Sequence, residues 1–143
     1  MSKITKIKGR QVFDSRGNPT VEAEVHLDDG SYASAIVPSG ASKGTHEAFE
    51  LRDLENKDYL GKSVFKSLEK INREISKVLI GFSSENQKKI DETLIELDGT
   101  KQKKRLGANT TLSISLAISK AAAVSKKISL FKNLSDKHTL PLP

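Results

Sequence analysis

The fold class is decided by the stretch Val21-Glu22-Ala23-Glu24-Val25-His26-Leu27, in which apolar and polar residues alternate strictly. A period of two places the Val, Ala and Leu side chains on one face of a strand and the charged side chains on the other, which is typical of a half-buried antiparallel strand. The turn residues Asp28-Asp29-Gly30-Ser31 follow, and Tyr32-Ala33-Ser34-Ala35-Ile36-Val37 resumes extended character. Together the runs predict a β-hairpin.

A further strand is predicted upstream, from Ile4 to Phe13. Its alternation is interrupted at Gly9, so we expect a β-bulge there. The sequence Arg16-Gly17-Asn18-Pro19 then turns the chain back, and the Asp14 side chain is expected to bond the backbone of this turn. The simplest arrangement of the three strands is an antiparallel meander.

After the strands the apolar period becomes helical. One helix is predicted between Gly61 and Gly81, where apolar residues fall at spacings of three and four. A second helix is predicted to begin at Ser84-Glu85-Asn86-Gln87, which has the form of a capping box, and to end at Asp98-Gly99. The apolar side of the first helix consists of Val64, Leu68, Ile71, Ile75, Val78 and Leu79, and that of the second of Ile90, Leu94 and Leu97.

Two more helices are predicted in the last third of the chain. A long one should run from about Ala108 to Lys126, and its Ala, Ser and Leu composition indicates close neighbours on more than one side, so we expect it to be central. A short helix is expected between Ser129 and Asp136. Strands first and helices afterwards predict an α+β fold, a three-stranded antiparallel β-meander followed by a helical bundle.

The composition narrows the classes of protein to consider. At 143 residues the chain fits one domain, and without Cys it has no disulfide, thiolate metal site or thiol nucleophile. The longest apolar-rich stretch, Leu112 to Val124, is interrupted by three Ser and one Lys, so no membrane span is predicted. No apolar run follows Met1-Ser2-Lys3, so we expect no secretory signal and a cytoplasmic protein.

The chain is basic, with 24 Lys and Arg against 18 Asp and Glu, a net charge of +6. A local excess lies at Lys101-Gln102-Lys103-Lys104-Arg105, and such patches can bind nucleic acid. The five Phe and two Tyr are not clustered with these lysines, so a solvated surface is the favoured interpretation. Binding to DNA that weakens steeply with salt would favour the alternative.

Residues 37–47 have the composition of a ligand-binding loop. Gly40 and Gly44 allow backbone angles closed to other residues, and Ser39 and Ser42 carry hydroxyl groups beside exposed N–H groups. Such a loop can lay its backbone against an anion. It matches neither the Gly-x-Ser-x-Gly turn of hydrolases nor the phosphate-binding Gly-x-x-x-x-Gly-Lys-Ser/Thr loop.

Oxygen ligation fits the serines of this loop better than nucleophilic attack, because the spacing supplies no base. A Ser hydroxyl and carbonyl can ligate Mg2+, but one loop cannot hold the ion without carboxylates or phosphate oxygens from elsewhere. His46, beside Glu47, could reach a bound anion or shuttle a proton, or be only a surface histidine. Arg10 and Glu22, on neighbouring predicted strands, could pair with each other or face a partner subunit.

Many short motifs resemble the opening of enolase, the phosphopyruvate hydratase family, in the same order and over essentially the whole chain. They are Lys3-Ile4, Gly9-Arg10, Asp14-Ser15-Arg16-Gly17-Asn18-Pro19-Thr20-Val21-Glu22, Pro38-Ser39-Gly40-Ala41-Ser42, Glu50-Leu51-Arg52-Asp53, Leu60-Gly61-Lys62, Leu97-Asp98-Gly99-Thr100, Leu106-Gly107-Ala108-Asn109 and Ser115-Leu116-Ala117. Lys43 departs from the pattern, because the family usually has Thr there.

The resemblance implies that residues 1–139 form a capping domain and residues 140–143 begin a linker to a β/α barrel that is absent from this chain. In the family the barrel supplies the catalytic base, the acid and the ligands of a first Mg2+. The reaction is the reversible dehydration of 2-phosphoglycerate to phosphoenolpyruvate, a lyase step of glycolysis. No catalytic residue is therefore expected here, and the chain alone is expected to be inactive.

The resemblance also implies roles for particular residues. Ser42 would ligate a second Mg2+, and Arg10 and Glu22 would form ion pairs with another subunit of a homodimer or higher homo-oligomer. The loop that would close over the substrate consists of Ser39, Gly40, Ala41, Ser42, Lys43, Gly44, Thr45 and His46. Some family members are found secreted or on the cell surface and bind plasminogen, a role without local evidence in this chain. The remaining alternative is a purely structural or interaction module, which self-association without any ligand response would favour.

Overall fold

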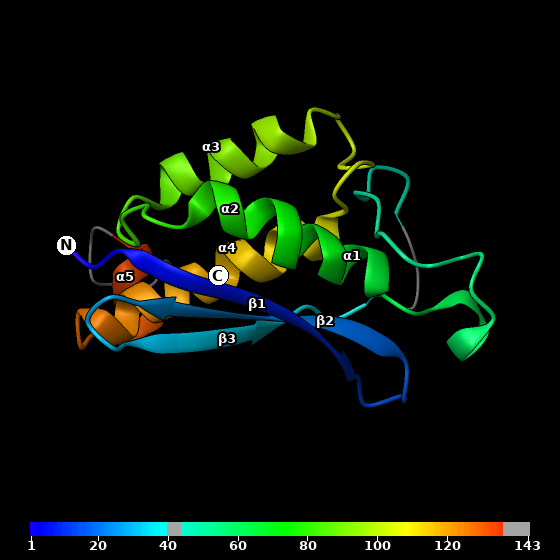
Figure 1. Ribbon diagram of the computed structural model, residues 1–143, viewed down its shortest axis with the longest axis horizontal. Helices are drawn as coiled ribbons and strands as arrows, with labels where there is room; N and C mark the ends of the chain where they lie inside the picture. Colours follow the sequence, from blue (N-terminus) through cyan, green and yellow to red (C-terminus); the bar gives the residue numbers. More distant parts are fainter. Residues whose placement is uncertain (40–43, 136–143) are drawn as a thin grey trace.

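The computed structural model describes residues 1–39 and 44–135, and it places a three-stranded sheet against a set of helices (Figure 1). Strands β1 (Ile4–Phe13), β2 (Pro19–Leu27) and β3 (Tyr32–Ile36) lie in that order and are antiparallel. The helices follow the strands along the chain. The predicted α+β fold and its meander are therefore confirmed.

The middle strand, β2, carries the apolar face on which the helices pack. Val21, Ala23 and Val25 are fully buried and Leu27 is 3% exposed. This face contacts α4 (Ala108–Ser125), which also contacts β3. The strict alternation of the sequence therefore corresponds to the two sides of the sheet.

The β-bulge predicted at Gly9 is wrong. Gly9 pairs regularly with Ala23, and the irregularity in the pairing of β1 with β2 lies between Ile4 and Lys6. Position 9 is instead crowded, because a Cβ atom there would lie 3.0–3.1 Å from side-chain atoms of the fully buried Ile71, which would have to shift by a few tenths of an ångström. The glycine therefore serves close packing between the strand and a helix.

The helix predicted between Gly61 and Gly81 is built from consecutive pieces. They are α1 (Phe65–Glu69), the π-helical η2 (Lys70–Ile75) and α2 (Ser76–Leu79), preceded by the short 3-10 helix η1 (Asp58–Gly61). Ile71, Ile75 and Leu79 are fully buried as predicted, but Val78 is 37% exposed and its predicted place on the apolar side is wrong. A π-helical turn holds more residues than an α-helical one, so the buried residues Ile71, Ile75 and Leu79 follow at a spacing of four. Val78 therefore lies next to the buried side and not on it.

Asn86 caps the N-terminus of helix α3 (Gln87–Asp98), because its side-chain oxygen accepts a hydrogen bond from the Lys89 N–H at 3.2 Å. The capping box predicted from Ser84 is wrong, because Ser84 is buried and its hydroxyl pairs with that of Ser2 at 2.8 Å. The predicted end is confirmed. Gly99 caps α3 in the left-handed conformation, with φ of 69°.

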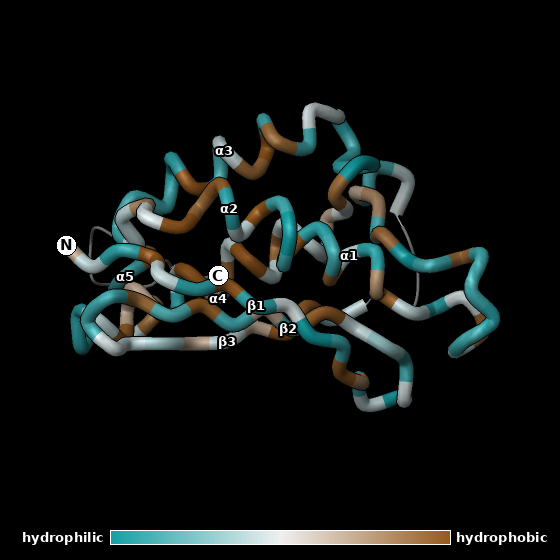
Figure 2. The backbone as a smooth tube through the Cα atoms, in the orientation of Figure 1, coloured by the Kyte–Doolittle hydropathy of each residue, from teal (hydrophilic) through white to brown (hydrophobic). Residues whose placement is uncertain are grey.

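Helix α4 contacts β2, β3, α3 and the short α5 (Leu130–Leu134), so its predicted central place is confirmed. Many of its buried residues are small, which lets these neighbours approach closely. Figure 2 shows hydrophobic and hydrophilic residues alternating along α3, as expected of a helix with one buried side. Within the described ranges, no helix is long and apolar enough to cross a membrane.

Candidate functional site

The turn after β1 is held by Asp14, as the sequence predicts. The Asp14 Oδ1 atom accepts hydrogen bonds from the N–H groups of Arg16 and Asn18, both at 2.9 Å. The hydrogen bond from Asn18, supported by that from Arg16, holds the pKa of Asp14 below its usual range against the effect of burial. The turn is thereby fixed next to Ser39, whose carbonyl accepts a hydrogen bond from Arg16 Nη2 at 2.9 Å.

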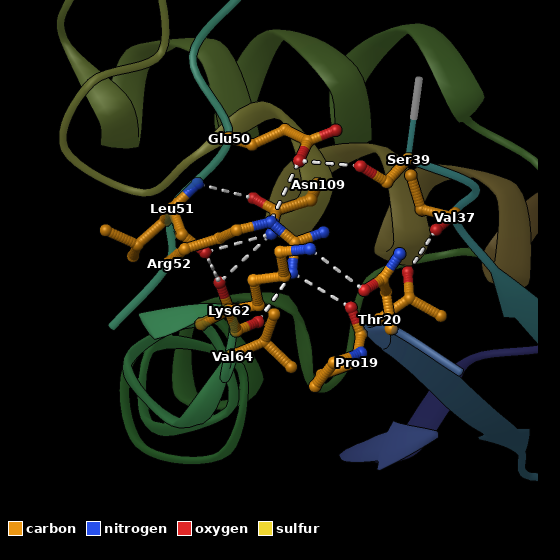
Figure 3. Close-up of polar contacts among 12 residues, drawn as sticks. Pro19, Thr20, Val37, Ser39, Glu50, Leu51, Arg52, Lys62, Val64 and Asn109 are labelled. Carbon is orange, nitrogen blue, oxygen red and sulfur yellow. Dashed lines mark hydrogen bonds and ion pairs between the residues drawn. The ribbon is translucent and has the colours of Figure 1, made fainter. Parts of the chain in front are cut away.

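Ser39 is also held through its hydroxyl, which donates to Glu50 Oε2 at 3.2 Å. The same oxygen of Glu50 accepts a hydrogen bond from Arg52 Nε at 3.1 Å. Arg52 Nη1 in turn donates to the backbone carbonyls of Pro19 at 2.9 Å and Lys62 at 2.6 Å (Figure 3). We call Arg16, Ser39, Glu50 and Arg52 the loop-stem cluster.

The backbone just after the loop is fixed by Asn109, at the start of α4. This side chain is 5% exposed, accepts from the Leu51 N–H at 2.9 Å and donates to the Leu51 carbonyl at 3.0 Å. Phe49 adds two backbone hydrogen bonds, to the Gln102 carbonyl at 2.8 Å and from the Ala108 N–H at 2.7 Å. Residues 49–51 are therefore anchored to the start of α4 and to the connection between α3 and α4.

That connection is organised by Asp98, which is 2% exposed at the end of α3. Its carboxylate accepts hydrogen bonds from the Leu106 N–H at 2.7 Å and from both the N–H and the hydroxyl of Thr100. Burial tends to raise the pKa of Asp98, but the hydrogen bonds from Thr100 and Leu106 outweigh it and leave the pKa below its usual value.

His46 lines the same surface hollow as part of the basic segment at residues 101–105. A surface hollow of about 500 Å³ is lined by His46, Ala48, Thr100, Lys101, Gln102 and Lys104. His46 and its neighbours Gly44 and Thr45 are exposed, and the Gly44 N–H donates to Glu47 Oε2 at 3.0 Å. Gly40, Ala41, Ser42 and Lys43 of the predicted loop lie outside the described residues.

Arg10 and Glu22 are brought together across β1 and β2, with Arg10 Nη1 3.1 Å from Glu22 Oε2. Arg10 has a second partner, which was not predicted from the sequence. Its Nη2 atom lies 3.0 Å from Glu24 Oε2. Ion pairs with Glu24 and Glu22 raise the pKa of Arg10, while His26 and Arg10 lower that of Glu24. Glu24 belongs to the same face of β2 as Glu22, so the period-two pattern offered a signal for it.

The roles of Glu50, Arg52 and Asn109 were not predicted from the sequence, although Glu50-Leu51-Arg52-Asp53 and Leu106-Gly107-Ala108-Asn109 are motifs of the resemblance. Their partners are 11, 33 and 58 residues away in the chain for the contacts to Ser39, Pro19 and Leu51, so no local spacing points to them. Within residues 1–39 and 44–135, no three His, Cys, Asp or Glu side chains gather as a metal site.

Comparison with known proteins agrees with this architecture. The model of a family described as "Enolase, N-terminal domain" matches residues 4–134. Over all 143 of its residues the chain is 57% identical to the protein named enolase in Pelagibacter ubique (strain HTCC1062). It spans 34% of the length of that relative. The chain therefore belongs to the enolase family, and its fold is that of the family's N-terminal domain.

Proposed function

We propose that this chain is the N-terminal part of a cytoplasmic enolase that reversibly dehydrates 2-phosphoglycerate to phosphoenolpyruvate. The observation that carries the proposal is the 57% identity to a protein named enolase over all 143 residues of the chain. The base and acid would come from residues outside this chain. The contribution of the chain would be binding and enclosure of the substrate rather than bond breaking.

The proposed role of the loop is supported by the way Ser39, at its start, and residues 49–51, shortly after its end, are held. Ser39 is fixed by Arg16 and Glu50, and residues 49–51 are fixed by Asn109 and the backbone of the α3–α4 connection. A loop with fixed ends can change conformation without moving the domain that carries it. This property suits a lid that excludes water from a bound substrate.

The proposed cofactor is Mg2+, which would stabilise negative charge that develops on the substrate. Of this chain, Ser42 would contribute an oxygen ligand, with the other ligands coming from substrate and from outside the chain. The test is a Mg2+ titration of turnover with and without Ser42→Ala in an active enzyme that contains this chain. An unchanged Mg2+ requirement would remove Ser42 from the proposed site.

The sheet face with Arg10 and Glu22 is proposed to contact a second copy of the enzyme. The Arg10 side chain is 36% exposed although its guanidinium is paired with Glu22 and Glu24, so part of this side chain is accessible to another subunit. Sedimentation of an active enzyme containing Arg10→Ala tests this proposal. An unchanged dissociation constant of the oligomer would contradict it.

The activity is tested with a chimera in which this chain replaces the matching part of the Pelagibacter ubique enolase. We expect the chimera to form phosphoenolpyruvate from 2-phosphoglycerate, followed by ultraviolet absorbance, and the isolated 143-residue chain to give no turnover above the blank at any Mg2+ concentration. The Pelagibacter ubique enolase serves as the positive control. A folded but inactive chimera would contradict the proposed function, and turnover by the isolated chain would contradict the assignment of the base and acid to residues outside it.

A further inference from the structure

Glu50 lies where separate loops of the protein meet. One of its carboxylate oxygens, Oε2, accepts hydrogen bonds from the Ser39 hydroxyl at 3.2 Å and from Arg52 Nε at 3.1 Å (Figure 3). The side chains of Glu50 and Arg52 are only 13% and 14% exposed, so salt and water screen their attraction less than that of a surface pair. Hydrogen bonds to ionised groups are also stronger than those between neutral groups.

The contacts of Glu50 belong to a closed ring. Arg52, which donates to Glu50, also donates a hydrogen bond from Nη1 to the Pro19 carbonyl at 2.9 Å, at the end of the turn that follows β1. Arg16, in the same turn, donates to the Ser39 carbonyl at 2.9 Å. Ser39 is therefore connected to the turn in two ways. Its carbonyl accepts a hydrogen bond directly from Arg16, and its hydroxyl is connected to Pro19 through Glu50 and Arg52.

The backbone next to Glu50 has anchors that do not depend on its carboxylate. Leu51 is bonded through both its N–H and its carbonyl to the buried Asn109 side chain. The Asp53 carboxylate accepts hydrogen bonds from the N–H groups of Phe65 and Lys66 at 2.8 and 3.0 Å, at the start of α1. Removal of the Glu50 carboxylate is therefore expected to release the Ser39 hydroxyl, while residues 51–53 stay in place.

We propose that Glu50 is a positioning residue, which sets the place of Ser39 relative to the turn formed by residues 14–18. The proposal rests on the proposed function, in which residues that follow Ser39 contact substrate and Mg2+. A carboxylate suits this role because a single oxygen accepts from Ser39 while its charge holds Arg52. Since misplacement by about 1 Å can cost about 100-fold in rate, and Ser39 forms only one end of the loop, we expect a loss of about tenfold.

The kinetic test uses the chimera with Glu50→Ala, Glu50→Gln or Glu55→Ala. Glu55 is a matched control, because it is exposed and has no hydrogen bond or ion pair with the described residues. Glu50→Ala is expected to lower kcat about tenfold and to raise the Mg2+ concentration that gives half-maximal turnover. A smaller fraction of folded enzyme would lower kcat but leave that Mg2+ concentration unchanged, so the second readout separates positioning from stability.

The conservative variant gives an independent check. In Glu50→Gln the amide oxygen can still accept from Ser39, but the charge that holds Arg52 is lost, so activity and Mg2+ requirement should lie between those of the chimera and of Glu50→Ala. A Mg2+ requirement unchanged from that of the unsubstituted chimera in both Glu50 variants would overturn the proposal. So would Glu55→Ala behaving like Glu50→Ala.

A second measurement needs no activity and separates this proposal from the proposed function. In the 143-residue chain, Glu50→Ala should shift the NMR signals of the Ser39 amide and the Arg16 and Arg52 side-chain N–H groups, and leave those of α4 in place. If the chimera is inactive but these shifts appear, the proposed function fails while the link from Glu50 to Ser39 stands. If the chimera is active and the Ser39 and Arg16 signals do not move, the positioning role of Glu50 is overturned.

Discussion

Gly107→Ala is expected to lower the free energy of unfolding by about 3 to 5 kcal/mol, from backbone strain and overpacking together. Gly107 precedes α4 with φ of 90° and ψ of 139°, a conformation that residues with a Cβ rarely adopt. A Cβ atom there would lie 2.5 Å from the Leu51 Cβ and 2.6 Å from the Asn109 Oδ1. The new methyl group would therefore also push apart the Leu51 and Asn109 groups that anchor the segment after the loop.

Urea unfolding followed by circular dichroism measures this effect, with Gly99→Ala as the matched control. Gly99 also has positive φ, 69°, but the nearest atom to an added Cβ is the Glu96 carbonyl oxygen at 3.7 Å. The control should therefore cost only the strain of a left-handed residue, about 1 to 2 kcal/mol. An equal loss of unfolding free energy in the two variants would show that the crowding against Leu51 and Asn109 does not contribute to the effect of Gly107→Ala.

Asp98→Ala is expected to lower the free energy of unfolding by about 2 to 3 kcal/mol at neutral pH, because it removes the acceptor of buried N–H groups. The Leu106 N–H would be left without its partner, and Leu106 is fully buried. The hydrogen bonds of Thr100 to the same carboxylate would also be lost, so the connection between α3 and α4 should loosen. Chemical denaturation of both proteins at pH 7 measures the difference.

The contribution of Asp98 should also depend on pH in one direction. Its pKa is lower in the folded protein than in the unfolded chain, so its ionisation stabilises the fold fully above the unfolded pKa of about 3.9, and this stabilisation is lost as the pH falls through the folded value. The stability difference between the protein and Asp98→Asn should therefore narrow below about pH 4. Glu96→Gln, at an exposed site in the same helix, is the control. A difference for Asp98→Asn that stays constant down to pH 3 would contradict this account.

Those structural features that depend on local pattern were predictable from the sequence. The alternation of residues 21–27 predicted the buried face of β2, and Gly99 marked the end of α3, because each pattern reports a property of neighbouring residues. Two of the predictions that were wrong, at Gly9 and Ser84, involve residues whose role is set by a partner far away in the chain. Gly9 faces Ile71 rather than forming a bulge, and Ser84 bonds Ser2 rather than capping a helix.

In the candidate site, too, some features follow from neighbouring residues and others from residues far apart in the chain. Its ligand-binding loop stays a prediction, made from the glycines and serines between Val37 and Glu47, which are local features. The loop-stem cluster was not predictable from the sequence, because two strands and the turn between them separate Arg16 from Ser39 in the chain. His46 likewise lines one hollow with Lys101 and Lys104, which lie far away in the chain, so no local spacing predicts that they come together.

The sequence by itself determined the order of strands and helices and which side of most of them is buried, because the period of apolar residues is a local record of burial. Only the tertiary structure decided that Glu50 links Ser39 to Arg52, that Asn109 fixes Leu51, and that Gly107 has no room for a methyl group. These features depend on distances between segments far apart in the chain. Packing of the helices on the sheet sets those distances, and the properties of neighbouring residues do not.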